Sequence, residues 1–205
     1  MKISIILGHP TKGSFNHAIA DTAKKFFQSR GDEIYFHDLY EENFDPILPT
    51  EEIPKDGQVG QVIQKYCNEI LISDGIIIVH PNWWGQPPAI LKGWIDRVIR
   101  PGVAYEFEET DSGEGVPIGL LKAQCAVVFN TSNTPSEREQ NVFKDPLERL
   151  WNNCIFNLCG IKKIHRKMYN IVCISTLEQR NAWLNDVQEI LREAFPKKSQ
   201  SKNSA

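Results

Sequence analysis

Three classes of protein are excluded by what this sequence of 205 residues lacks. It contains no run of 18 apolar residues, the length that a membrane-spanning helix needs. Its 23 Lys and Arg residues are outnumbered by 26 Asp and Glu residues, so no basic surface for nucleic acid is expected. Its first residues lack the charged, apolar and small-residue zones of a secretory signal peptide, so we expect a cytoplasmic protein.

Cysteine is sparse and irregularly spaced. The five cysteines are an odd number, and none of them belongs to a CxxC pair. A structural zinc site needs four ligands at tighter spacing, so we expect no metal site. We interpret the cysteines as reduced thiols that are mostly buried in apolar surroundings.

Short apolar runs alternate along the chain with segments of helical periodicity. The predicted strands are residues 2–7, 33–38, 75–80 and 124–130, with a last strand near 162–168 or 170–174. The predicted helices are residues 16–30, 58–73, 89–98, 145–158 and 176–195, and residues 43–57 are expected to be irregular. Thr176 is the expected cap of the last helix, with Glu178 beside it.

This alternation predicts an α/β fold with a five-stranded parallel sheet and helices on both faces. Residues 1–196 are expected to form a single domain, and residues 197–205 a polar, disordered tail. In such sheets, ligands bind beyond the carboxyl ends of the strands. The segments 8–16, 80–87 and 130–138 reach this edge, so we look for the functional site there.

The first of these segments, LGHPTKGSFN, resembles two phosphate-binding motifs without matching either. The residue after Gly13 is Ser14 rather than the lysine of the nucleoside triphosphate loop, and the dinucleotide pattern GxGxxG is absent. Ser14 and the amides of Phe15 and Asn16 are placed to hold a phosphate at a helix N-terminus, with His9 as a further donor. Two alternatives stay open: Ser14 only caps the helix, and His9 is an ordinary loop histidine.

The second and third segments carry aromatic and polar groups. Trp83 and Trp84 follow Pro81 and Asn82 at a strand end, where a flat ligand would justify both rings, and Gly85 permits close backbone approach. The third segment presents polar groups for a ring edge, namely Thr131, Ser132 and Asn133. Packing of the tryptophans in a core or subunit interface, and an ordinary polar turn, are the alternatives. A phosphate cradle, an aromatic surface and a polar edge together describe a flavin site.

Several motifs resemble those of the flavodoxin-like NAD(P)H:quinone oxidoreductases. This group includes DT-diaphorase, the modulators of drug activity and the quinone reductases ancillary to potassium efflux. The motifs are GHPTKGSFNHAIA, HDLYEENFDPIL, HPNWWGQPPAILKGWIDRV, GVAYEF and CGI, and they span about residues 1 to 165.

The resemblance assigns roles to the residues of the three segments. It implies that His9, Ser14, Phe15 and Asn16 contact the phosphates and ribityl chain of a flavin, and that Thr131, Ser132 and Asn133 meet the pyrimidine edge. It places Pro81, Asn82, Trp83, Trp84 and Gly85 along the isoalloxazine, with Trp83 against the ring and Trp84 facing the substrate. It places Tyr105 and Phe107 over the substrate cavity, often across a dimer interface.

The resemblance implies a flavin-dependent NAD(P)H:quinone oxidoreductase that binds FAD, with FMN as the alternative. A flavodoxin-type electron carrier and a flavin-bound regulatory subunit of a membrane transporter are the competing hypotheses. The animal enzymes of the family carry a tyrosine and a histidine after the third segment, but here PSEREQNVFKD offers Glu137 and Glu139 instead. No catalytic side chain is therefore assigned.

A homodimer is also expected. The stretch from Trp94 to Phe107 holds Arg97, Arg100 and Tyr105, more aromatic and charged groups than the surface of a monomer needs. Two-fold symmetry would then complete each cavity from both chains.

Overall fold

The computed structural model describes residues 1–107, 115 and 117–197 and contains a five-stranded sheet. All neighbouring strands are parallel, in the order β2-β1-β3-β6-β7. Their bounds are β1 (Lys2–Leu7), β2 (Glu33–Asp38), β3 (Gly75–Pro81), β6 (Cys125–Ser132) and β7 (Ile164–Asn170). The predicted fold class is confirmed, and the last strand extends across the boundary between the two ranges expected for it.

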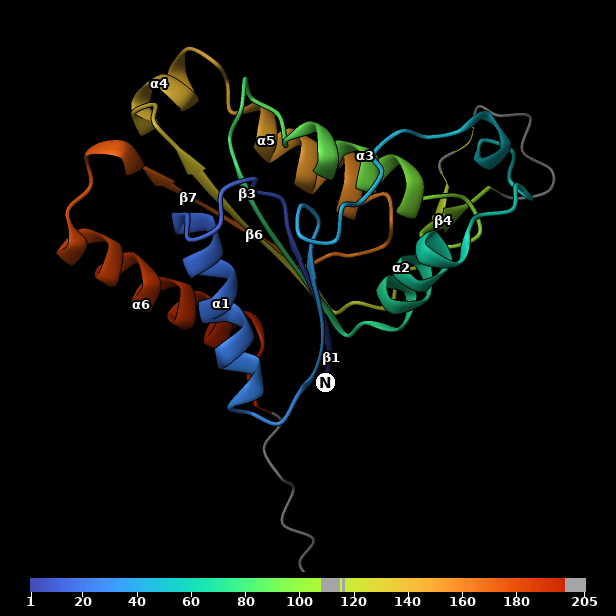
Figure 1. Cartoon of the computed structure of the whole chain (residues 1–205), viewed down its shortest axis with the longest axis horizontal. Coiled ribbons are helices and arrows are strands. Elements are labelled where there is room, and N and C mark those ends of the chain that lie inside the picture. Colours follow the sequence, from blue (N-terminus) through green and yellow to red (C-terminus); the bar gives the residue numbers. More distant parts are fainter. Residues whose placement is uncertain (108–114, 116, 198–205) are drawn as a thin grey trace, which may run out of the picture.

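Helices cover both faces of the sheet (Figure 1). One face carries α1 (Phe15–Gln28) and α6 (Leu177–Ala194). The other carries α2 (Gln61–Ile72), α3 (Ala89–Val98) and a helical segment that begins as α5 (Pro146–Glu148) and continues as the π-helix η2 (Arg149–Phe156). Within the residues that the structure describes, no helix is long and apolar enough to cross a membrane.

The shortest elements were not predicted from the sequence. They are η1 (Thr50–Glu52), the antiparallel pair β4 (Tyr105–Glu106) and β5 (Ile118–Gly119), α4 (Ser136–Asn141) and η3 (Val172–Ile174). Each is too short to show a hydrophobic period. The expected polar tail is residues 197–205, of which 198–205 lie outside the described part of the chain, as do residues 108–114 and 116.

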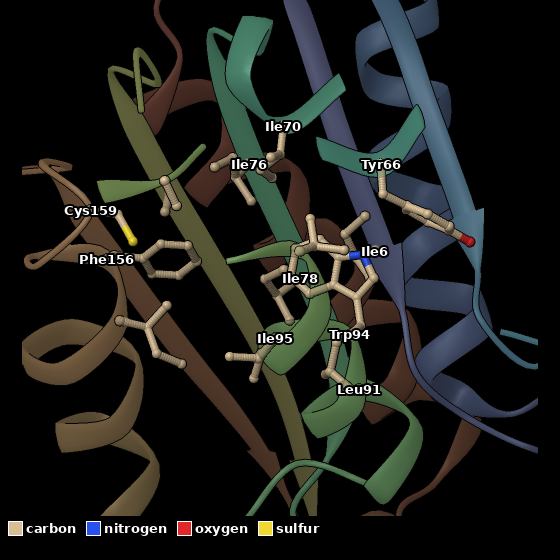
Figure 2. Close-up of a cluster of buried hydrophobic side chains, with 14 of the residues drawn as sticks. Ile6, Tyr66, Ile70, Ile76, Ile78, Leu91, Trp94, Ile95, Phe156 and Cys159 are labelled. Carbon is tan, nitrogen blue, oxygen red and sulfur yellow. The ribbon is translucent and has the colours of Figure 1, made fainter. Parts of the chain in front are cut away.

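Two apolar clusters form because side chains alternate along each strand. Ile5 and Ile77 point towards α1 and α6. Ile6 and Ile78 point the other way, where they pack with Trp94 of α3. Figure 2 shows this second cluster between strands β1 and β3 and the helices α2 and α3. Both faces of the sheet are therefore buried under helices, as expected for a parallel sheet.

The cysteines divide by burial. Cys67, Cys125 and Cys159 are buried, and burial raises the pKa of the first two thiols to about 11 and that of Cys159 to about 12. Cys154 and Cys173 are exposed. The interpretation as buried, reduced thiols therefore holds for three of the five, and no cluster suited to a metal ion occurs among the described residues.

Helix caps explain where the terminal helix begins. Thr176 caps α6 as predicted, but Gln179 rather than Glu178 completes the capping box. The Thr176 Oγ1 accepts from the Gln179 backbone N–H at 3.1 Å, and the Gln179 Oε1 accepts from the Thr176 N–H at 3.3 Å. A side chain three residues after the cap can reach back in this way, whereas the side chain of Glu178 at two residues cannot.

The arginines of α3 and the residues after it are internal rather than displayed on the surface. Arg97 donates to both carboxylate oxygens of Glu52, at 3.0 and 2.6 Å. Arg100 donates to the carbonyls of Glu52 and Gly57 at 3.0 and 2.9 Å. The two side chains therefore hold the irregular segment 43–57 against the molecule. The argument that these arginines exceed the needs of a monomer was wrong.

A buried polar cluster lies behind the carboxyl edge of the sheet. His80 of β3 is fully buried, and its Nδ1–H donates to the Pro81 carbonyl at 2.8 Å. Its Nε2 accepts from Asn130 Nδ2 at 2.8 Å and from Trp151 Nε1 at 2.9 Å. Because Nε2 receives these donors, the imidazole is neutral, and burial lowers the pKa of His80 to about 4.

Acidification should therefore destabilise the fold through His80. Above pH 6.5 the imidazole is neutral in both the folded and the unfolded state. Between pH 6.5 and 4 only the unfolded chain takes up the proton, so this contribution to stability is lost as the pH falls. The loss amounts to about 3 kcal/mol when a pKa falls from 6.5 to about 4.

The measurement is urea unfolding of wild type and His80→Gln between pH 7 and 4. The variant is expected to be less stable at pH 7 but to lose less stability on acidification. Equal losses in the two proteins would show that His80 is not the group that resists protonation.

Candidate functional site

The three segments singled out in the sequence meet at one rim of the sheet. The strand order changes direction between β1 and β3, because β2 lies on one side of β1 and all later strands lie on the other. Ligands of open α/β sheets bind at such a switch point. The Gly8 N–H donates to the Val79 carbonyl at 2.9 Å, and the Asn82 N–H to the Thr131 carbonyl at 2.7 Å. These bonds fix the three loop openings next to one another.

A cavity of about 340 Å³ lies at this rim, and the three segments line it together. Its volume falls within the range usual for small-molecule sites. All the predicted cofactor-binding residues line it except Trp84 and Gly85. The lining consists of His9, Ser14, Phe15, Asn16, Pro81, Asn82, Trp83, Thr131, Ser132, Asn133, Thr134, Val172 and Cys173.

Sequence reasoning missed the fourth wall of this cavity. Val172 and Cys173 belong to η3, the short helix that follows β7. The Cys173 N–H donates to the Asn133 Oδ1 at 2.9 Å, which ties this helix to the third segment. The end of the last strand would have indicated this part of the cavity wall. The sequence, however, predicts two alternative positions for that strand.

Ser14 caps a helix and also lines the cavity. It is the N-cap of α1, and its Oγ accepts from the His17 backbone N–H at 3.4 Å. The same side chain lines the cavity. Gly13 before it has a φ of +75°, a conformation that favours glycine, and so turns the chain into the cap. The positive end of the α1 dipole therefore lies at the cavity wall.

His9 lies between the helix N-terminus and the tryptophan. Its ring centroid is 6.0 Å from that of His17 and 6.4 Å from that of Trp83. The Thr11 N–H donates to its Nδ1 at 3.1 Å, so the proton of the neutral ring is on Nε2. Burial lowers the pKa of His9. At neutral pH, His9 is therefore uncharged and keeps the N–H of its Nε2 as a donor.

Asn16 contributes an unsatisfied polar atom at the cavity wall. Its side chain is buried, with 3% of the residue exposed, and its Nδ2 donates to Thr131 Oγ1 at 2.9 Å. Its Oδ1 is buried without a hydrogen-bond partner. Because buried polar atoms are nearly always paired, a ligand that supplies a hydroxyl or N–H group would complete this site. The hydroxyl groups of a ribityl chain are donors of this kind.

The tryptophans belong to a tight turn. The Trp83 N–H donates to the Gln86 carbonyl at 3.1 Å, and the Gln86 N–H to the Trp83 carbonyl at 3.0 Å. The central residues Trp84 and Gly85 have φ angles of +56° and +72°, as in a type I′ turn. The turn leaves Trp83 43% exposed beside the cavity and Trp84 fully exposed.

Comparison with known proteins identifies the family of this chain. The family model of the flavodoxin-like fold matches residues 1–190. The chain belongs to the flavodoxin-like family. A relative from Haemophilus influenzae, an uncharacterized NAD(P)H oxidoreductase, is 38% identical over 185 residues, which cover 88% of this chain and 89% of the relative.

Two further proteins extend the comparison. Human ribosyldihydronicotinamide dehydrogenase [quinone] is 26% identical over 220 residues, covering 94% of this chain and 93% of the human protein. The crystal structure of Smu.1420 from Streptococcus mutans UA159 is 30% identical and superposes with a TM-score of 0.78. The match covers 94% of this chain and 100% of that one.

In this flavodoxin-like chain, Glu139 joins two of the segments at the rim. It lies in α4 and is buried, and its Oε1 accepts from Asn82 Nδ2 and from Ser132 Oγ, both at 3.0 Å. Asn82 Oδ1 in turn accepts from the Gly85 N–H at 2.9 Å. Glu139 therefore positions the tryptophan turn relative to the end of β6, a role that no motif in the sequence revealed.

A second cavity adjoins the first. It has a volume of about 410 Å³ and shares Asn82 and Thr134 with its neighbour. Its remaining lining residues are Trp84, Gly85, Glu139, Phe143 and Pro146. The two predicted residues that do not reach the first cavity, Trp84 and Gly85, thus belong to this one.

Tyr105 and Phe107 lie away from both cavities within one chain. They line a separate cavity of about 410 Å³ with Ile99, Pro117, Ile155 and other residues. Figure 1 shows β4, which contains Tyr105, on the opposite side of the molecule from α4. A single chain therefore does not bring these aromatic side chains to the rim.

The turn makes a prediction about stability. A left-handed conformation costs a bulky residue about 1 kcal/mol, whereas asparagine tolerates it. Since Trp84 is fully exposed, its replacement removes no packing within the chain. Trp84→Asn should therefore raise the free energy of unfolding by about 1 kcal/mol, measured by chemical denaturation without ligand. Trp83→Asn is the control, because Trp83 is not in this conformation and should gain nothing. A destabilised Trp84→Asn protein would contradict the account of strain.

Proposed function

We propose that this chain is a flavin-dependent NAD(P)H:quinone oxidoreductase. The observation that carries the proposal is the cavity at the β1–β3 switch point. It combines a helix N-terminus with Ser14 and His9, an unpartnered Asn16 oxygen and the exposed Trp83. The names of the relatives from Haemophilus influenzae and human support the same reaction class.

Each part of the cavity has a role in holding a flavin. Ser14, the amides at the start of α1 and the neutral His9 donate to the phosphate end. The Asn16 oxygen accepts from a ribityl hydroxyl, and Trp83 supplies an apolar face for the ring. When bound, the flavin accepts a hydride from NAD(P)H and passes it to a quinone.

The adjoining cavity is the proposed site of the reacting partner. Trp84 and Phe143 provide apolar surface, and Glu139 holds Asn82 so that the turn keeps its place. Because one cavity serves both the nicotinamide and the acceptor, the oxidised nucleotide must leave before the quinone binds. Turnover is then ping-pong.

FAD is the proposed cofactor, with FMN as the alternative. The helix N-terminus accommodates either a pyrophosphate or a single phosphate. We assign no preference between NADH and NADPH, since no residue could be assigned as a clamp for a 2′-phosphate. We also propose that residues 1–196 act as one flavin-binding domain in the cytoplasm, consistent with the net charge of −3 and the buried thiols.

A homodimer is part of this proposal. Tyr105 and Phe107 resemble residues that cover the substrate in the family, yet they lie away from the rim of their own chain. A partner chain is the means by which they would reach it. Exposed apolar side chains support an interface, namely Phe107, Ile118, Val142 and Phe143.

The oligomeric state is measured by light scattering of the purified protein at micromolar concentration. The expected mass is about twice the 23.4 kDa of one chain. A mass of 23.4 kDa for the flavin-loaded protein would contradict the dimer, while leaving the cofactor assignment standing.

The reaction is tested with two measurements on one preparation. Mass spectrometry of the released yellow cofactor should identify FAD or FMN. Stopped-flow or steady-state oxidation of NADH and NADPH should then accelerate when menadione is added. A flavin-loaded protein that does not oxidise either nucleotide would instead favour the electron carrier or the regulatory subunit. A colourless protein that gains no flavin on incubation would overturn the proposal.

A further inference from the structure

We propose that His17, which lies behind the cavity wall, controls phosphate binding through Ser14, and that the site holds a phosphate only when His17 is an imidazolium. The proposal rests on the proposed function, since the ligand is the phosphate end of a flavin. His17 is a positioning residue, because its side chain acts through the Ser14 hydroxyl rather than on the ligand.

Three side chains form a hydrogen-bonded chain that ends at the cavity. Asp38 Oδ2 is 3.0 Å from His17 Nε2, and His17 Nδ1 is 2.9 Å from Ser14 Oγ. The Asp38 and His17 side chains are only 7% and 16% exposed. Asp38 is itself fixed, because its Oδ1 accepts from the backbone N–H groups of Tyr40 and Glu41. Of these three residues, only Ser14 lines the cavity.

Counting protons shows which state of His17 permits an anion to bind. The carboxylate of Asp38 requires a proton on Nε2. In the neutral ring Nδ1 then has none, so it accepts a hydrogen bond from the Ser14 hydroxyl, and only oxygen lone pairs of Ser14 face the cavity. In the imidazolium Nδ1 also carries a proton and donates to Ser14 Oγ. The hydroxyl proton is then available to the phosphate.

The other neutral form of His17 is ruled out by its neighbour. With the proton on Nδ1 alone, the unprotonated Nε2 would face the Asp38 carboxylate at 3.0 Å, where two lone pairs repel each other. The imidazolium satisfies Asp38 and Ser14 together. It also places a positive charge one side chain away from the phosphate, where charge-assisted bonds are stronger than neutral ones.

Few other titratable groups lie near the hydrogen-bonded side chains of Asp38, His17 and Ser14. His9 lies 6.0 Å away, centroid to centroid, and burial lowers its pKa, so it stays neutral in the range considered. Glu41 is exposed and pairs with Lys12 at 2.8 Å, so these two charges offset each other. Cys173 lines the same cavity.

Evidence for a ligand at this place does not depend on the helix N-terminus alone. The residue two places after Ser14 is Asn16, whose buried Oδ1 has no partner and whose side chain lines the same cavity. The phosphate position and the ribityl position are therefore adjacent, in the order that a flavin nucleotide requires. Riboflavin, which has no phosphate, would occupy the ribityl position and leave the phosphate position empty.

The experiment titrates the flavin-free protein with FAD, FMN and riboflavin from pH 7 to 9, following flavin fluorescence. A phosphate monoester is almost fully dianionic above pH 7, so the ligand itself contributes little to the pH dependence. If binding requires one proton on His17, the affinity for FAD and FMN approaches a tenfold decrease per pH unit once the free protein has lost that proton. Riboflavin affinity should stay constant.

Two variants provide a matched pair. His17→Gln supplies a neutral amide that does not titrate, so its FAD and FMN affinities should be lower at pH 7 and independent of pH. His9→Gln should also bind more weakly but keep the wild-type pH dependence, because His9 is not linked to Asp38. Calorimetry of wild type in two buffers of different ionisation enthalpy should show proton uptake on FMN binding, and needs no variant.

The outcomes separate this proposal from the proposed function. Tight flavin binding without pH dependence overturns the role of His17 and leaves the flavin site intact. A pH dependence that persists in His17→Gln also overturns it, and assigns the proton to another group such as the Cys173 thiol. Failure of all three flavins to bind at pH 7 overturns both.

Discussion

The parallel pairing of β1, β3 and β6 is the constraint on which the site depends. Because the three strands share one direction, their carboxyl ends meet at one rim, and residues far apart in sequence become neighbours. Two backbone bonds beyond the paired residues, from Gly8 to Val79 and from Asn82 to Thr131, extend this alignment into the loops. A phosphate-binding segment and an aromatic segment can then face one cavity.

Side chains behind the rim keep this arrangement rigid. Glu139 links Asn82 to Ser132, and His80 links Pro81 to the buried Asn130 and Trp151. Apart from the half-buried Asn82, these residues are buried, and their polar groups are hydrogen-bonded, so moving one would leave others unpaired at a cost of about 1–3 kcal/mol each. Trp84 differs from these buried residues, because it is exposed and has a left-handed backbone conformation. Such strain is concentrated at functional sites, since a position that serves only stability would avoid it.

The sequence predicted the elements with a clear hydrophobic period and the loops that follow them. Helix 89–98 and the first four strands were predicted at or near their observed bounds, and the last strand lies across its two expected ranges. Most of the predicted site residues line the cavity, because a loop rich in Gly, Pro and Trp is recognisable from the sequence alone. Glu139 and His17 were not identified, since their roles come from partners 57 and 21 residues away in the chain. The internal position of Arg97 and Arg100 was missed for the same reason, because η1, which contains Glu52, has only three residues.

The most direct test of the central claim is a crystal structure of the protein with its bound flavin. The account predicts the phosphate within hydrogen-bonding distance of Ser14 Oγ and the first amides of α1, and a ribityl hydroxyl on Asn16 Oδ1. It also predicts the ring beside Trp83. A flavin bound elsewhere on the molecule, or one whose phosphate lies away from the N-terminus of α1, would contradict it.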